Sequence, residues 1–221
     1  MPREHFHHEL EQVQESMLVM ASMVSKAIER SVVALKQRDE RLAHEVIADD
    51  VKINHQRFGI EEQCLHLIAT QQPMASDLRV IAAVLHIITD LERMGDHAEG
   101  IAKIAIMEAD TPPLKPLIDI PRMAEMSRDM LSRAMDAYVA RDTEAARQIA
   151  QDDDKVDMLY DQVYRELLTF MMADPGTITQ ATHLLWVAHN LERIADRVTN
   201  ICERVVFLTT GRMDEINVSK Y

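Results

Sequence analysis

Acidic side chains recur in pairs, four residues apart, at four places in the chain. The pairs are Asp50/Asn54 (in which an amide replaces the second acid), Glu92/Asp96, Asp153/Asp157 and Glu192/Asp196. Residues i and i+4 lie on one face of an α-helix, where two like charges repel by a few tenths of a kcal/mol even when exposed. Four such pairs therefore indicate a partner, either a cation or a proton.

Metal binding is the chemistry that this set of donors favours. The pairs contain carboxylate and amide oxygens, no Cys and no His. Hard oxygen ligands of this kind select Mg²⁺, Mn²⁺, Ca²⁺ or iron, and favour Zn²⁺ less. We predict that these eight residues are metal ligands, with iron, manganese, magnesium or zinc as candidate ions. Ordinary ion pairing is the alternative, because cations adjoin each acidic block at Lys52, Arg93, Lys155 and Arg193.

Two prolines indicate how the pairs meet. Asn54 lies 19 residues before Pro73, and Glu92 lies 19 residues after it. The second-half pairs lie 17 to 22 residues on either side of Pro175. If each proline marks the tip of an antiparallel helix pair, the acids face each other about 26–35 Å from that tip, at ~1.5 Å per residue. Each half of the chain would then bring two pairs of ligands together.

The composition predicts long helices. Only 5 of the 221 residues are Gly and 7 are Pro, and aromatic residues make up 4%. A β-sandwich or barrel needs a turn every 8–12 residues, so this composition argues against both. Apolar residues amount to 47%, which is enough for a packed core. The net charge of −13 argues against nucleic-acid binding, because phosphate groups would be repelled.

Apolar positions repeat with a helical period. Steps of three and four join Phe6, Leu10, Val13, Met17, Met20, Val24, Ala27, Ser31 and Leu35, and later Met123, Ser127, Met130, Ala134 and Tyr138. Helix ends are indicated by the prolines and by two Arg-Asp dipeptides whose Asp can cap the next helix. The pattern predicts six helices, at 4–38, 40–71, 74–109, 121–140, 143–173 and 176–210. Pro73 and Pro175 are expected in the first turn of a helix, and Trp186 in the core.

The charged positions show an internal repeat. A shift of 103 residues places Arg38, Asp39, Asp49, Asp50 and Lys52 on Arg141, Asp142, Asp152, Asp153 and Lys155. A shift of 100 places Leu91-Glu92-Arg93-x-x-Asp96 on Leu191-Glu192-Arg193-x-x-Asp196. General helix amphipathicity would match apolar positions instead. We predict an all-α protein of two tandem, pseudo-symmetric three-helix bundles from an internal duplication: residues 1–111, a Pro-rich linker at 112–121, and residues 122–221.

The cellular location is also an expectation. The two cysteines, Cys64 and Cys202, cannot form a disulfide framework, and free thiols are typical of a reducing cytosol. The first residues contain no apolar signal segment, and no apolar run approaches the ~20 residues of a membrane span. We expect a soluble, cytoplasmic protein.

Four segments carry a resemblance to a known family. They read QPMASDLR at 72–79, DLERMGD at 90–96, NLERIADR at 190–197 and NICE at 200–203. Together with the acidic stretches at 50–54 and 153–157, they resemble the PhoU family of phosphate-uptake regulators. The resemblance extends over nearly the whole chain.

This resemblance implies a fold and a role. Family members are all-α, built of two similar three-helix bundles, and often form homodimers. They are non-enzymatic, cytoplasmic, negative regulators of the phosphate response. They are thought to couple the phosphate ABC transporter, through its ATPase subunit, to a sensor histidine kinase, and so reach the membrane only through partners. Some bind multinuclear iron or other metals through E/D-x-x-x-D motifs, which match Asp50, Glu92, Asp96, Asp153, Asp157, Glu192 and Asp196 of this chain.

One departure and two alternatives accompany this interpretation. Asn54 stands where the second half has Asp157, so the first site is expected to be the weaker one. A helical adaptor that needs no metal is the first alternative. A ferritin-like di-iron enzyme is the second, but such sites use two Glu-x-x-His motifs on facing helices. This chain has that motif only at Glu4/His7, close to its beginning.

Overall fold

Six long helices make up the computed structural model, which describes residues 2–213, 215 and 216. They are α1 (Pro2–Gln37), α2 (Glu40–Gln71), α3 (Ser76–Met107), α4 (Asp119–Ala140), α5 (Thr143–Ala173) and α6 (Ile178–Thr210), with one short 3-10 turn, η1 (Pro175–Thr177), before α6. The described residues include no β-strand. The predicted all-α class is confirmed, and each predicted helix begins and ends within two residues of the observed one.

Two equivalent turns join the first two helices of each half. Arg38 and Arg141 both adopt a left-handed conformation, with φ of 58° and 53°. The next residue in each case is an N-cap: Asp39 accepts a hydrogen bond from Leu42 N, and Asp142 accepts from Glu144 N and Ala145 N. The caps satisfy amide groups that have no partner within the helix. The predicted caps are therefore confirmed at both Arg-Asp dipeptides.

The prolines at the hairpin tips behave differently from each other. Pro175 begins η1, with α6 directly after it. Pro73 lies outside the helices, between Gln72 and Ala75, which both have positive φ. These left-handed residues end α2 and delay α3 until Ser76, so the expectation that Pro73 opens a helix is wrong.

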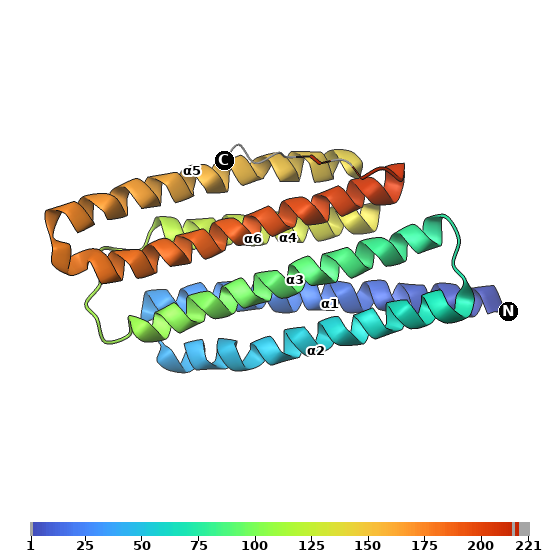
Figure 1. Cartoon of the computed structure of the whole chain (residues 1–221), viewed down its shortest axis with the longest axis horizontal. Helices are drawn as coiled ribbons and strands as arrows, with labels where there is room; N and C mark the ends of the chain where they lie inside the picture. The colour runs from blue at the N-terminus through green and yellow to red at the C-terminus, as the bar shows by residue number, and fades with distance from the viewer. Residues whose placement is uncertain (1, 214, 217–221) are drawn as a thin grey trace.

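The helices form two bundles that lie side by side (Figure 1). In this view α3 and α6 cross the front of the molecule next to each other, α2 and α5 flank them, and α1 and α4 lie behind. The pairings of α3 with α6 and of α1 with α4 join the bundles. All the residues of the predicted apolar seams on α1 and α4 are buried. Trp186 is the exception to the core prediction, because it is 52% exposed on α6.

The contact between α3 and α6 has its own pseudo-twofold symmetry. Asp90 on α3 accepts hydrogen bonds from Arg197, at 3.3 Å, and Asn200, at 3.1 Å, on α6. His97 on α3 lies 2.8 Å from the side-chain oxygen of Asn190 on α6. A shift of 100 residues converts the first pair of positions, 90 and 197, into the second, 190 and 97. The interface thus uses the same two positions from each repeat, as in a symmetric dimer.

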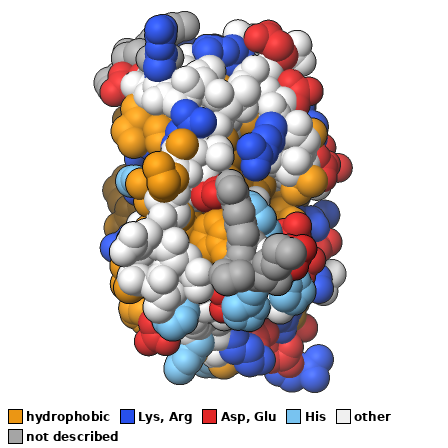
Figure 2. Space-filling view, turned by 90° about the vertical axis from the view of Figure 1, so that its right-hand side faces the viewer, with side chains coloured by type: hydrophobic (Ala, Val, Ile, Leu, Met, Phe, Trp, Pro, Cys, Tyr) orange, Lys and Arg blue, Asp and Glu red, His pale blue; other side chains and the backbone are white. Residues whose placement is uncertain are grey.

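Several histidine side chains are exposed at one end of the molecule (Figure 2). Figure 2 looks onto the end where the chain begins and shows His side chains gathered over the lower bundle. On α1, Nε2 of the exposed His5 lies 3.6 Å from a carboxylate oxygen of Glu9. Among the described residues, no helix is long and apolar enough to cross a membrane.

Both thiols are expected to be unreactive in the native protein. Cys64 and Cys202 are fully buried, and burial raises the pKa of each to about 12. Because the thiolate is the nucleophile, neither cysteine should react with a disulfide reagent until the helices open. Colorimetric titration should find no reactive thiol under native conditions and two in denaturant. Rapid native labelling of either cysteine would contradict its burial between the helices.

Candidate metal centres

The first acidic cluster lies between α2 and α3. Asp50 projects from α2 towards α3 at Gly95, where a Cβ would stand 3.2 Å from Asp50 Oδ1. The missing side chain lets this carboxylate approach the helix between Glu92 and Asp96. Asn54, one turn along α2, donates a hydrogen bond to the other carboxylate oxygen of Asp50 at 2.7 Å. The structure thus brings all four predicted residues of the first half to one place.

The second acidic cluster lies between α5 and α6 and repeats the first. Asp153 and Asp157 on α5 face Glu192 and Asp196 on α6, and the four carboxylates are close enough to influence one another's ionisation. Asp153 is only 5% exposed, and the other three are partly buried. The acids therefore stand at the edge of the packed interface, because each follows an apolar stripe along its helix.

A second set of acids, Asp49 and Asp152, forms the salt bridges with the neighbouring lysines. Asp49 pairs with Arg30 at 2.6 Å and Lys52 at 2.6 Å. At positions 103 residues later, Asp152 pairs with Arg133 at 2.7 Å and Lys155 at 2.5 Å. The lysines on which the ion-pairing alternative relied therefore pair with Asp49 and Asp152, and not with the predicted ligands. Neither lysine pairs with the inward-facing Asp50 or Asp153, and no salt bridge to these two acids occurs among the described residues.

The arginines beside the glutamates do reach the clusters. Arg93 contacts Asp96 at 2.9 Å, and Arg193 contacts Asp196 at 2.6 Å. Each also lies near the preceding glutamate, at 3.5 Å from Glu92 and 3.8 Å from Glu192. One carboxylate of each cluster is therefore neutralised by a single, partly exposed arginine.

The remaining carboxylates keep oxygens that no partner satisfies. Within the described residues, Oδ1 of Asp50, Oδ1 of Asp153 and Oε2 of Glu192 are buried without a hydrogen bond. Burial, and then the charge of Asp157, raise the pKa of Asp153 to about 7. Burial, and then Asp196, raise the pKa of Glu192 to about 7 as well. The pKa of Asp50 is also raised, first by burial and then by Asp96, Glu99 and Glu92.

These clusters supply oxygen ligands without forming a closed ligand shell. Among the described residues, no three His, Cys, Asp or Glu side chains are already arranged to hold a metal ion. Asp96 and Asp196 are turned to their arginines instead. The donor set nevertheless fits a hard cation, because buried, unpartnered carboxylate oxygens of raised pKa gain most from a positive charge.

Two contributors, Glu99 and Tyr160, were missed in the sequence. Glu99 adds its charge to the first cluster and pairs with Lys103 at 2.6 Å. Its position, seven residues after Glu92 on the same helix face, was the available signal. In the second cluster, Nδ1 of His189 lies 3.4 Å from Glu192, and its ring lies 6.1 Å from that of Tyr160. Only the fold brings Tyr160 to this place.

Comparisons with known proteins agree with the duplicated fold. The family model of the PhoU domain matches this chain twice, at residues 17–105 and 120–205. The chain belongs to the PhoU family. The two matched PhoU segments fall on α1–α3 and α4–α6, so each bundle is one PhoU domain.

PhoU relatives are similar over almost their full length. A protein of Aquifex aeolicus called phosphate-specific transport system accessory protein PhoU homolog is 42% identical over 205 residues, which cover 93% of both chains. The crystal structure of PhoU from Pseudomonas aeruginosa superposes with a TM-score of 0.89 at 36% identity, covering 94% of this chain and 100% of that one. The phosphate transport system regulatory protein PhoU from Streptococcus pneumoniae gives a TM-score of 0.88 at 32% identity, covering 95% and 99%. This chain is therefore similar to accessory proteins of phosphate transport.

Proposed function

We propose that this protein is a cytoplasmic, non-enzymatic negative regulator of phosphate uptake, which couples the phosphate ABC transporter to a sensor histidine kinase. The observation that carries the proposal is the double match to the PhoU domain, together with relatives named accessory proteins of the phosphate-specific transport system. The transporter's ATPase subunit is the contact on the membrane side. The paired bundles offer long helical faces, and the chain acts as a homodimer.

Metal is the second part of the proposal. Asp50, Asn54, Glu92 and Asp96 would hold an ion between α2 and α3, and Asp153, Asp157, Glu192 and Asp196 would hold one or more between α5 and α6. A bound cation would neutralise the crowded carboxylates and fix the two helices of each hairpin relative to each other. Three buried carboxylate oxygens without a hydrogen bond support this part of the proposal; one of them, Oε2 of Glu192, lies 3.4 Å from Nδ1 of His189. Asp96 and Asp196 would exchange their arginine for the ion.

A metal-independent adaptor is the second candidate. It is favoured by the ion pairs from Arg93 and Arg193, which already offset part of the charge in each cluster. The di-iron enzyme has no such support, because Glu4 and His7 lie in the exposed first turns of α1 rather than between packed helices.

A deletion strain tests the regulatory role. In the host, loss of the gene should turn on phosphate-starvation genes in phosphate-rich medium, and the wild-type gene should restore repression. Normal repression in the deletion strain would contradict the proposal. Complementation with Asp153→Ala/Asp157→Ala/Glu192→Ala/Asp196→Ala then separates the two candidates: failure supports the metal-dependent regulator, and full repression supports the metal-independent adaptor.

Asn54→Asp should strengthen the first metal site. Asn54 is the amide in a cluster of acids and already touches Asp50 at 2.7 Å. A carboxylate at this position adds a charged ligand, so Mn²⁺ affinity at the first site should rise about tenfold, while the protein without metal loses stability through added repulsion. Calorimetric titration of a variant with the second site removed isolates this effect. Unchanged affinity would show that residue 54 does not face the ion.

A further inference from the structure

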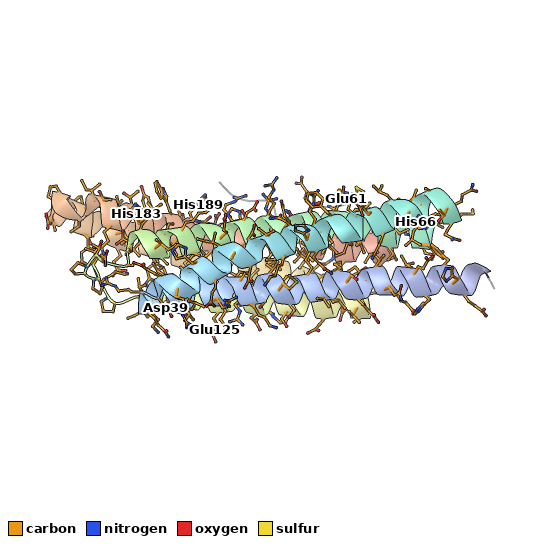
Figure 3. The ribbon with its side chains drawn as sticks, turned by 90° about the horizontal axis from the view of Figure 1, so that it is seen from below. Asp39, Glu61, His66, Glu125, His183 and His189 are labelled. Atoms are coloured by element: carbon orange, nitrogen blue, oxygen red, sulfur yellow. The ribbon has the colours of Figure 1, made fainter. Side chains whose placement is uncertain are left out.

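A cavity of 270 Å³ lies at the end of the molecule opposite the α2–α3 turn. Its walls come from the end of α1, the end of α3, the Pro-rich linker and the start of α6, so it lies where the two repeats are joined. Figure 3 labels His183 on α6 and Asp39 in the α1–α2 turn, which both lie at this end. The cavity lies about two helical turns along α6 from the second acidic cluster, and none of the predicted metal ligands lines it.

The walls of the cavity are largely hydrocarbon. Six apolar side chains line it: Leu35, Pro113, Leu114, Pro116, Leu117 and Leu184. The linker that supplies four of them is held in place by contacts of its own. Arg38 donates to the carbonyl of Thr111, Gln180 donates to that of Pro112, and Lys115 pairs with Glu166. The apolar walls are therefore anchored to α1, α5 and α6.

One buried carboxylate lines this cavity and keeps an oxygen without a hydrogen bond. The side chain of Glu108, at the end of α3, is only 9% exposed and lines the cavity. Its Oε1 lies 2.5 Å from Nδ1 of His183. Its Oε2 is buried and has no hydrogen-bond partner among the described residues. An unsatisfied buried carboxylate oxygen costs free energy that a donor entering the cavity would recover.

The internal repeat shows that the fold does not require this charge. The shift of 100 residues that relates α3 to α6 places Glu108 on Leu208 and His183 on Ala83. Both counterparts are apolar and buried. The Glu108–His183 pair therefore departs from the duplicated pattern at the place where an apolar cavity adjoins it. A buried carboxyl group that the duplicated pattern does not require, beside an apolar cavity, is typical of a ligand site.

We propose that this cavity binds a small organic ammonium compound with an apolar body, the ammonium group donating to Oε2 of Glu108. An ammonium ion is the donor that suits a buried carboxylate best, because the hydrogen bond is then charge-assisted. The hydrocarbon part packs on the leucine and proline walls. Lys36, Arg38 and Lys115 also line the cavity and favour a compound that carries a carboxylate besides its ammonium group, so apolar amino acids and simple amines are the two sources of this chemistry.

Trp186 provides the readout. It is the single tryptophan of the chain, and its ring centroid lies 5.7 Å from that of His183. A ligand that engages Glu108 alters the charge environment of His183 and hence the fluorescence of Trp186. Three matched probes separate the contributions: phenethylamine, phenylalanine, and 3-phenylpropanoate, which keeps the ring and the carboxylate but lacks the ammonium group.

Titration of the full-length protein with these probes tests the proposal, with calorimetry as a second measurement. Phenethylamine and phenylalanine should give saturable changes, and 3-phenylpropanoate should give none. Tighter binding of phenylalanine assigns the site to amino acids, and tighter binding of phenethylamine assigns it to amines. Absence of saturable binding by both, or equal binding of 3-phenylpropanoate, would overturn the proposal.

Substitutions inside and outside the cavity test whether the probes bind there. Glu108→Gln should weaken phenethylamine binding by about tenfold or more. Leu184→Phe, which fills the cavity and leaves Glu108 in place, should do the same and serves if Glu108→Gln folds poorly. Asp136→Asn is the matched control, because this acid lines a different groove, between α1 and α4, and should bind like the wild type. Trp186→Phe should lose the fluorescence signal and retain the heat of binding. Wild-type affinity in both cavity variants would refute the site.

Discussion

Asp153→Asn should stabilise the metal-free protein while removing the response to metal of the cluster between α5 and α6. Asp153 is 5% exposed, forms no salt bridge with any residue that the structure describes, and lies beside Asp157 on α5 and opposite Asp196 on α6. An amide of the same shape removes the buried charge and its repulsion, which is worth about 1–2 kcal/mol near pH 8. This corresponds to a rise in Tm of about 3–6 °C for a chain of this size. Thermal unfolding in the presence of a chelator measures it.

The pH dependence has a definite sign. The pKa of Asp153 is about 7 in the folded protein, above its ordinary value. A raised carboxyl pKa means that the folded state prefers the protonated group, so wild-type stability falls as pH rises through this interval. The advantage of Asp153→Asn should therefore be small at pH 5 and largest above pH 7. An advantage that does not vary with pH would show that the buried charge is not its cause.

The neighbouring residue supplies the control. Burial would raise the pKa of Asp152, but its hydrogen bonds from Lys155 and Arg133 lower that pKa below the ordinary value. Asp152→Asn should therefore destabilise the protein and leave metal binding intact. Excess Mn²⁺ should raise the Tm of the wild type and of Asp152→Asn by similar amounts, and raise the Tm of Asp153→Asn less, because only the site between α2 and α3 remains complete. If both variants shift Tm in the same direction in chelator, the assignment of inward and outward acids is wrong.

Asp90→Ala should lower the stability of the joined bundles more than any single surface change. Asp90 is buried in the α3–α6 seam and accepts from Arg197 and Asn200. Its removal leaves the partly buried Arg197 guanidinium without this carboxylate. The cost of stranding a charged donor is about 2–3 kcal/mol, or a fall in Tm of roughly 5–10 °C. Denaturant unfolding measures the loss.

A substitution at the pseudo-symmetric position, Asn190, distinguishes the loss of a charged contact from the mere loss of side-chain atoms. Asn190→Ala removes the equivalent residue of the second repeat, whose partner is His97. Burial lowers the pKa of His97 below its ordinary value, so this contact joins two neutral groups near pH 7. The loss should be about 1 kcal/mol. Equal losses in the two variants would show that charge at Asp90 contributes nothing to the seam.

Most of the fold could be predicted from the sequence, because the helices are long and regularly patterned. The apolar seam from Phe6 to Leu35 follows one helix face, and every member is buried. The distances from Pro73 placed Asp50 level with Asp96, and Asp50 indeed lies against the adjoining Gly95. Periodicity does not measure how wide the buried stripe is, and this is why Trp186 was expected in the core although it is half exposed.

The candidate site could be predicted in its residues more than in its electrostatics. Spacing identified the acids, but it could not tell that Lys52 would reach Asp49 rather than Asp50. That choice depends on side-chain direction around the helix, which sequence distance does not encode. The Glu108–His183 contact was also invisible, because it joins residues 75 positions apart across the two repeats.

Metal analysis of the purified protein tests the central claim most directly. After treatment with a chelator and then incubation with Mn²⁺, Fe²⁺, Mg²⁺ or Zn²⁺, elemental analysis should find bound metal in the wild type. The variant Asp153→Ala/Asp157→Ala/Glu192→Ala/Asp196→Ala should lose the share held between α5 and α6. No bound metal in the wild type, or equal metal in the variant, would contradict metal binding and reduce the acidic clusters to surface features of a helical adaptor.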